Sequence, residues 1–131
     1  MHRILLLFVS IFIGFNSCSK TEDIGSLENI QSLDEFKGII SSGVSLIFFH
    51  ASWCPNCQEQ RPAIEALTKR DDLKAAKIYQ VDYEEIKEVV NEYNIIGFPT
   101  IVFYKNNVEV KRFESKGHSE EELANILKGL L

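Results

Sequence analysis

The stretch Trp53-Cys54-Pro55-Asn56-Cys57 places two cysteines three residues apart, directly after an apolar run that predicts a buried strand. At the start of a helix, residues i and i+3 lie on one face, so the two sulfurs can close a small disulfide ring. Free backbone N–H groups and the positive end of the helix dipole favour a thiolate at the first cysteine. Pro55 suits the first helical turn, where its missing N–H breaks no bond. The stretch therefore indicates a reversible dithiol and disulfide pair, and with it a redox protein.

The composition is that of one globular domain. The chain has 131 residues, of which 45% are hydrophobic and 25% charged, a size that suits a single core. Its formal net charge is -5, whereas proteins that bind nucleic acid concentrate Lys and Arg on one face. We therefore expect no nucleic-acid partner, and we expect a monomer.

The N-terminal residues 1–17 have the layout of a signal peptide. A basic start at Met1-His2-Arg3 precedes an apolar run from Ile4 to Phe15 and a small polar end. The run is too short to cross a bilayer as a helix, which needs about 20 residues. We therefore expect an exported protein of the cell envelope or periplasm, where disulfides persist.

Cys18 is the cysteine left over once Cys54 and Cys57 are paired, because the chain has three cysteines. Its position resembles that of the lipid-modified cysteine of bacterial lipoproteins, although Phe15 and Asn16 stand where those leaders usually have Leu and a small residue. The resemblance implies a lipid anchor to a membrane at Cys18. Ordinary cleavage nearby, with Cys18 removed or left as an incidental thiol, is the alternative.

Residues 18–27 then read as a polar tether, and residues 28–131 as the domain. The domain pattern alternates helices and strands. Two capping boxes, Ser32 with Glu35 and Ser119 with Glu122, predict helix starts. We expect helices at 32–40, 55–70 with a kink at Pro62, 84–93 and from 119 onward, strands at 44–49, 77–81, 100–104 and 108–113, and a tight turn at 105–107.

This order of elements resembles the thioredoxin family over about residues 28–131. The resemblance also rests on the Trp-Cys-x-x-Cys motif, on Pro62 five residues after Cys57, and on Gly97-Phe98-Pro99-Thr100. It implies an α/β thioredoxin fold, with a central mixed β-sheet flanked by helices and the cysteine pair at the N-terminus of a kinked helix. Two cysteines at this spacing also occur as half of a zinc site, but with no second pair we expect no metal.

The resemblance also implies roles for individual residues. Cys54 is expected as the exposed attacking thiol and Cys57 as the buried resolving thiol. Pro99 resembles the family's cis proline beside the dithiol, and the backbone of Phe98 would pair with an extended substrate segment. Trp53 resembles the aromatic residue that shields the active-site surface. An ordinary loop proline and simple packing of Trp53 are the alternatives.

Thiol chemistry then predicts the reaction. The Cys54 thiolate attacks a disulfide of a protein substrate, and Cys57 displaces the reduced product from the mixed disulfide. We expect no cofactor, but a redox partner in the membrane or envelope has to reset the pair if the protein is a reductase. Reduction is the direction that we expect.

Two other functions stay open at this point. Pro55-Asn56 replaces the Gly-Pro of ordinary thioredoxins, and proline in the first place is similar to glutaredoxins and to the DsbA oxidants, whose potentials of roughly -230 to -120 mV lie above the value of about -270 mV for thioredoxin. The first alternative is therefore a DsbA-like oxidant or isomerase. The second is a non-catalytic chaperone that binds copper(I) or a client protein, although the chain has only its initiator methionine.

His50 is a further candidate because the expected acid is absent. Many thioredoxins bury an acid six residues before the first cysteine, where this chain has Phe48. His50 follows two residues later, so in a strand it lies on the same face as Phe48. We hypothesise that His50 transfers protons, or when protonated stabilises the Cys54 thiolate. A core histidine satisfied by a backbone partner is the alternative.

Overall fold

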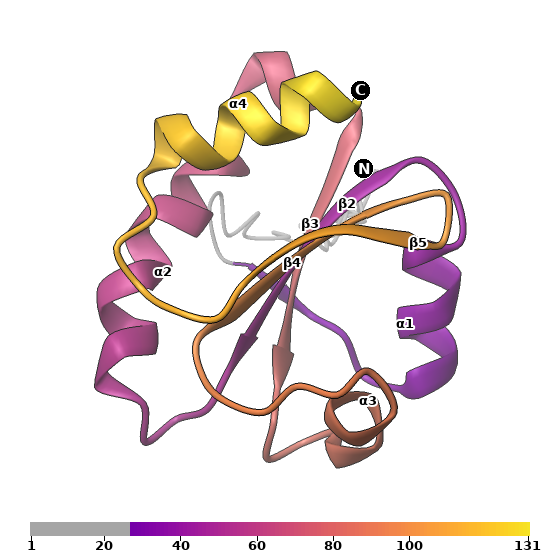
Figure 1. The fold of residues 1–131 in the computed structure, drawn as a ribbon, viewed down its shortest axis with the longest axis vertical. Coiled ribbons are helices and arrows are strands. Elements are labelled where there is room, and N and C mark those ends of the chain that lie inside the picture. The colour runs from indigo at the N-terminus through magenta and orange to yellow at the C-terminus, as the bar shows by residue number, and fades with distance from the viewer. Residues whose placement is uncertain (1–26) are drawn as a thin grey trace, which may run out of the picture.

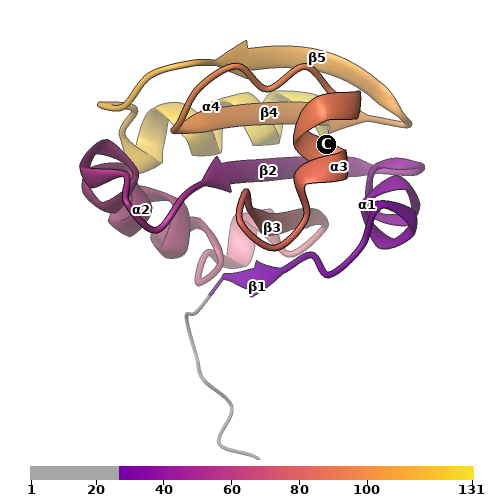
Figure 2. The same cartoon turned by 90° about the horizontal axis from the view of Figure 1, so that it is seen from below.

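The computed structural model describes residues 27–131, which form a five-stranded mixed sheet in the order β1-β3-β2-β4-β5 with helices on both faces (Figures 1 and 2). The expected α/β fold is confirmed. The leader, Cys18 and most of the tether lie outside the described residues, so the expectations for them stay predictions. The elements are β1 (Glu28–Asn29), α1 (Leu33–Ile40), β2 (Val44–His50), α2 (Pro55–Leu67), the 3-10 helix η1 (Asp71–Leu73), β3 (Ala76–Asp82), α3 (Lys87–Glu92), β4 (Thr100–Lys105), β5 (Val108–Phe113) and α4 (Glu120–Leu130).

Strand β2 lies at the centre of the sheet and all its residues are buried. It pairs in parallel with β3 and antiparallel with β4. Because successive side chains point to opposite faces, Leu46 and Phe48 pack in the layer beneath α2 and α4, whereas Ile47 and Phe49 pack against α1 and α3. Figure 1 shows these two pairs of helices on opposite sides of the sheet. The continuous apolar run before the cysteines thus corresponds to a strand covered on both faces.

The helix starts and the hairpin turn lie where their local signals predict them. The N–H of Glu35 donates to Ser32 Oγ at 3.1 Å, and the N–H of Glu122 donates to Ser119 Oγ at 3.2 Å. These bonds satisfy N–H groups that the first turn of a helix leaves free. The turn 105–107 places Asn106 at φ 49° and the next asparagine at φ 70°, in the left-handed region that asparagine tolerates.

Some boundaries differ from the expectation. Helix α2 ends at Leu67 rather than near residue 70, and the hydroxyl of Thr68 donates to the carbonyl of Glu65 at 2.7 Å where the helix closes. Helix α3 begins at Lys87 rather than 84, because Asp82 Oδ1 accepts the N–H of Glu84 at 2.8 Å and holds the preceding residues in a turn. Strand β1 and η1 were not expected. Pro62 lies inside α2 as predicted, and the kink there stays a prediction.

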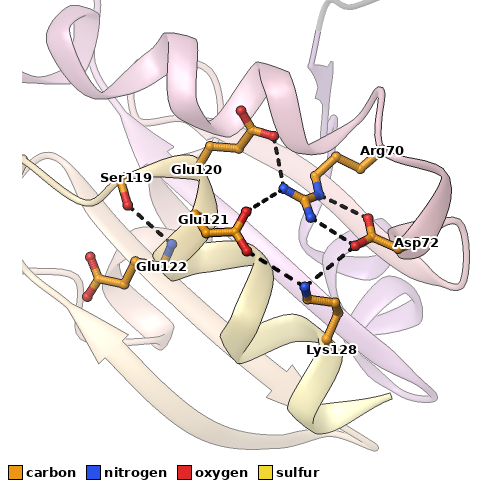
Figure 3. A network of polar contacts seen from close by, with 7 residues as sticks. All are labelled: Arg70, Asp72, Ser119, Glu120, Glu121, Glu122 and Lys128. Carbon is orange, nitrogen blue, oxygen red and sulfur yellow. Dashed lines mark hydrogen bonds and ion pairs between the residues drawn. The ribbon is translucent and has the colours of Figure 1, made fainter.

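Arg70 connects the segment after α2 to α4 (Figure 3). Its guanidinium donates to both carboxylate oxygens of Asp72 at 2.9 and 2.8 Å, to Glu120 at 3.2 Å and to Glu121 at 3.0 Å. Lys128 Nζ lies 3.6 Å from Asp72 and 3.8 Å from Glu121, which closes the network from the other end of α4. The hydrogen bonds from Arg70 lower the pKa of Asp72 from its ordinary 3.8 to about 2.

We predict that Arg70→Ala lowers the Tm by a few degrees, because among residues 27–131 Asp72 and Glu121 then keep only Lys128 as a counter-charge and Glu120 keeps none. Since the Asp72 pKa is lowered in the folded state, its stabilising contribution is present above pH about 4 and is lost as the pH falls toward 2. Melting curves followed by circular dichroism should therefore show a difference in Tm that shrinks over this range and in high salt. Lys74→Ala, which removes an exposed lysine 2.8 Å from Asp71, is the control and should leave the Tm almost unchanged. Equal Tm values for wild type and Arg70→Ala at neutral pH would contradict this account.

Candidate active site

Cys54 and Cys57 form a disulfide at the start of α2, with their Cα atoms 5.2 Å apart. Cys54 is the N-cap residue, with extended backbone angles of φ -94° and ψ 101°, and Pro55 occupies the first turn. The N–H of Cys57 donates to Cys54 Sγ at 3.1 Å. The pairing and the position at a helix start agree with the sequence prediction, and the same N–H is placed to stabilise a thiolate on Cys54.

The expected difference in exposure between the two cysteines is absent from this oxidised state. Cys54 is 2% exposed and Cys57 1%, so the expectation of an exposed Cys54 is wrong here. Both residues belong to the apolar layer that contains Phe48 and Ile64.

An exposed aromatic surface adjoins the disulfide. Trp53 is 64% exposed, and its ring meets Phe98 edge-on with centroids 6.0 Å apart. The Phe98-Pro99 peptide bond is cis, as the sequence resemblance implied. Phe98 also packs against Tyr83, at 5.2 Å between ring centroids. Tyr83 was missed by sequence reasoning, because its place beside Phe98 depends on β3 lying next to β2.

His50 lies at the end of β2 on the same face as Phe48, as predicted. The two rings stack with centroids 5.6 Å apart and an interplanar angle of 16°. The residue is 8% exposed, and its Nε2 atom is buried with no hydrogen-bond partner among residues 27–131. The alternative of a core histidine satisfied by a backbone partner therefore does not account for Nε2.

The charge state of His50 follows from its surroundings. Burial, and next the positive charge of Arg61, lower its pKa, whereas Asp82 and Glu84 act in the opposite direction. The imidazole is therefore neutral near neutral pH. This favours the proton-transfer form of the hypothesis about His50 and argues against a protonated imidazole that stabilises the Cys54 thiolate.

Arg61 covers the ring that replaces the family's buried acid. Its guanidinium carbon lies 5.5 Å from the centroid of Phe48, and its Nη1 donates to Gln80 Oε1 at 2.7 Å. Arg61 is one helical turn beyond Cys57, on the same face of α2. Sequence reasoning missed it, although the spacing of four residues from Cys57 was the available signal.

Gln60 holds the loop between β5 and α4 against α2. Its side chain is buried, accepts the N–H groups of Gly117 at 2.9 Å and His118 at 3.0 Å, and donates to the carbonyl of His118 at 2.7 Å. An ion pair between Lys116 and Glu59 joins the same two segments. The second turn of the helix that carries the disulfide is thereby fixed to the start of α4.

Residues 27–131 also bear on the expected membrane and metal contacts. None of their helices is long and apolar enough to cross a membrane. Within the same range, no group of three or more His, Cys, Asp and Glu side chains is arranged to hold a metal ion. The absence of a metal and of a cofactor in the working protein stays a prediction.

A disulfide between cysteines three residues apart, at the start of a helix that follows the central strand of a mixed sheet, defines a thiol-disulfide oxidoreductase. The chain belongs to the thioredoxin family, whose sequence model matches residues 28–129. Members of this family act on protein disulfides.

Individual relatives agree with this assignment. The Thioredoxin domain-containing protein 5 homolog of Drosophila melanogaster is 35% identical over 102 residues, which are 75% of this chain but only 24% of that protein. The thioredoxin of Chlamydia trachomatis is 32% identical over 83 residues, 63% of this chain and 79% of its own length. Among solved structures, the thioredoxin of Malassezia sympodialis superposes with a TM-score of 0.72 at 27% identity, over 81% of this chain and 91% of that one. The chain thus spans most of a thioredoxin and about a quarter of the Drosophila protein.

We predict that Gln60→Ala lowers the free energy of unfolding by about 1–3 kcal/mol, because it removes three hydrogen bonds between a buried side chain and the part-buried backbone of the loop. Urea denaturation followed by circular dichroism measures the change. Gln58→Ala, an exposed glutamine on the same helix, is the matched control and should unfold like the wild type. A Gln60→Ala protein as stable as the control would show that these bonds add nothing to stability.

Proposed function

We propose that the protein is an exported reductase of protein disulfides, held at a membrane by a lipid on Cys18. The disulfide at the start of α2, in a family that acts on protein disulfides, is the observation that carries the activity. Export and anchoring are supported by the sequence of residues 1–18.

The proposed reaction begins with the reduced pair. The Cys54 thiolate attacks one sulfur of the substrate disulfide, whose other sulfur leaves as a thiolate. Cys57 then attacks Cys54 Sγ in the mixed disulfide, which releases the second substrate thiol and re-forms the bond between Cys54 and Cys57. Two electrons have passed to the substrate, so a dithiol partner in the envelope or membrane has to return two electrons before the next cycle.

The substrate would lie on the aromatic surface beside the disulfide. Trp53 offers an exposed apolar ring, and the backbone of Phe98 would pair with an extended segment of the substrate. These interactions hold the scissile disulfide near Cys54 without a bound cofactor.

A DsbA-like oxidant or isomerase is the second candidate. It is favoured by Pro55-Asn56 between the cysteines and by the cation of Arg61 over the ring of Phe48, because a positive charge near the dithiol stabilises its thiolate form. The reduction potential separates the two directions. A value near -270 mV supports a reductase, and one near -120 mV supports an oxidant.

We predict that the reduced protein, supplied with dithiothreitol, accelerates the reduction of insulin disulfides and that Cys54→Ser abolishes the acceleration, because the attacking sulfur is gone. Turbidity of the released insulin chains measures the rate. Cys57→Ser should instead accumulate a mixed disulfide visible by mass spectrometry. Activity that survives Cys54→Ser would refute the role of the nucleophile. A wild-type protein with no activity would favour the copper- or client-binding chaperone.

We predict separately that Cys18→Ser releases the exported protein from the membrane fraction, because the anchor would be lost. Expression of the full chain in a bacterium with a lipoprotein pathway, followed by fractionation and labelling with a clickable fatty acid, tests this. Cys54→Ser is the control and should keep both the label and the membrane association. A wild-type chain without label would exclude the lipid anchor, and the proposed oxidoreductase activity would still stand.

A further inference from the structure

We propose that His50 is the proton acceptor for Cys57 when Cys57 resolves the mixed disulfide. The inference rests on the proposed thiol-disulfide exchange. A thiol attacks only as a thiolate, so a buried resolving cysteine needs a group that takes its proton. Phe48 occupies the position where the family buries an acid for this purpose and has no group that could accept a proton.

The fold brings His50 to the correct side of the sheet. Its ring stacks on Phe48, and Phe48 shares one apolar layer with Cys57. Within the part of the chain that the structure describes, Nε2 is buried with no hydrogen-bond partner, which is uncommon for a polar atom in a folded protein and calls for an explanation. In the tautomer that carries its proton on Nδ1, Nε2 has a free lone pair buried on the face of the dithiol, which is what a proton acceptor requires.

The neighbouring charges suit such an acceptor in both of its states. Burial and Arg61, which reaches across from α2, lower the pKa of His50 and keep the imidazole neutral before the transfer. Asp82 at the end of β3 and Glu84 in the following turn favour the protonated form. They therefore offset part of the cost of the charge that appears on the ring once the proton has moved.

The proposed step is balanced in protons and electrons. Nε2 takes the proton from Cys57, and the resulting thiolate attacks Cys54 Sγ. The bond between Cys54 and Cys57 forms as the bond between Cys54 and the substrate sulfur breaks. The substrate sulfur leaves with the electron pair and receives the proton from the imidazolium, so His50 is neutral again at the end.

A pH-jump experiment with a chromogenic aryl disulfide isolates this step. The reduced protein reacts at acid pH, where the mixed disulfide on Cys54 accumulates with one equivalent of coloured thiolate. After a jump to a chosen pH, Cys57 displaces the second equivalent, and stopped-flow absorbance records the rate. We expect His50→Gln to slow the second release at least about tenfold near pH 7, to leave the first release unchanged, and to match the wild type at alkaline pH, where Cys57 ionises unaided.

Two further variants make the test specific. His118→Gln is the matched control. This histidine lies in the loop between β5 and α4 and stacks on Phe113, so its replacement should leave the rate of the second thiolate release unchanged. Arg61→Met removes the cation that disfavours protonated His50, so the acid limb of the rate profile should move to higher pH. Because the cation also favours the Cys57 thiolate, the decisive result for this variant is an unmoved acid limb, which would overturn the proposal even if His50→Gln fails to fold.

The possible outcomes distinguish the role of His50 from the thiol-disulfide exchange on which it rests. A second release with the same pH profile in wild type and folded His50→Gln, or an unmoved acid limb in Arg61→Met, overturns the role of His50 alone. Absence of the first release in the wild type overturns the proposed exchange activity, and the inference with it.

Discussion

The pairing of β2 between β3 and β4 determines where every group of the active site lies. The strand is buried along its whole length. A slip of its pairing by one residue would move every side chain to the opposite face of the sheet, and so into the wrong apolar layer. Parallel pairing brings the ends of β2 and β3 together, with His50 opposite Asp82. The disulfide, the histidine and the aromatic surface around Phe98 are therefore consequences of one register.

The electrostatics of this site differ from what the family pattern implied. A carboxylate next to the buried thiol would oppose its ionisation, whereas here an aromatic ring covered by the guanidinium of Arg61 stands in that position. Gln80 fixes this guanidinium by accepting one of its N–H groups. Because the sulfurs lie in an apolar layer, a nearby charge acts on them more strongly than it would in water.

Local signals explain how much of this could be predicted from the sequence. The caps at Ser32 and Ser119, the apolar run of β2 and the asparagine turn depend on neighbours within a few residues, and they were located correctly. Strand β1 has two residues and exists only through its pairing with β3. The contacts of Arg61 with Gln80, and of Tyr83 with Phe98, likewise depend on strand order, which sequence spacing does not contain.

The burial of both sulfurs implies which cysteine moves when the disulfide opens. Cys57 lies inside α2, and α2 is fixed to the α4 region by Gln60 at its second turn and by Arg70 just beyond its end. Cys54 instead has extended backbone angles at the helix cap, next to the exposed Trp53. Reduction breaks the S–S bond, and the Cys54 sulfur then keeps the N–H of Cys57 as its hydrogen-bond donor at the start of α2. We therefore expect a gain in exposure on reduction at Cys54, whereas Cys57 is held inside α2.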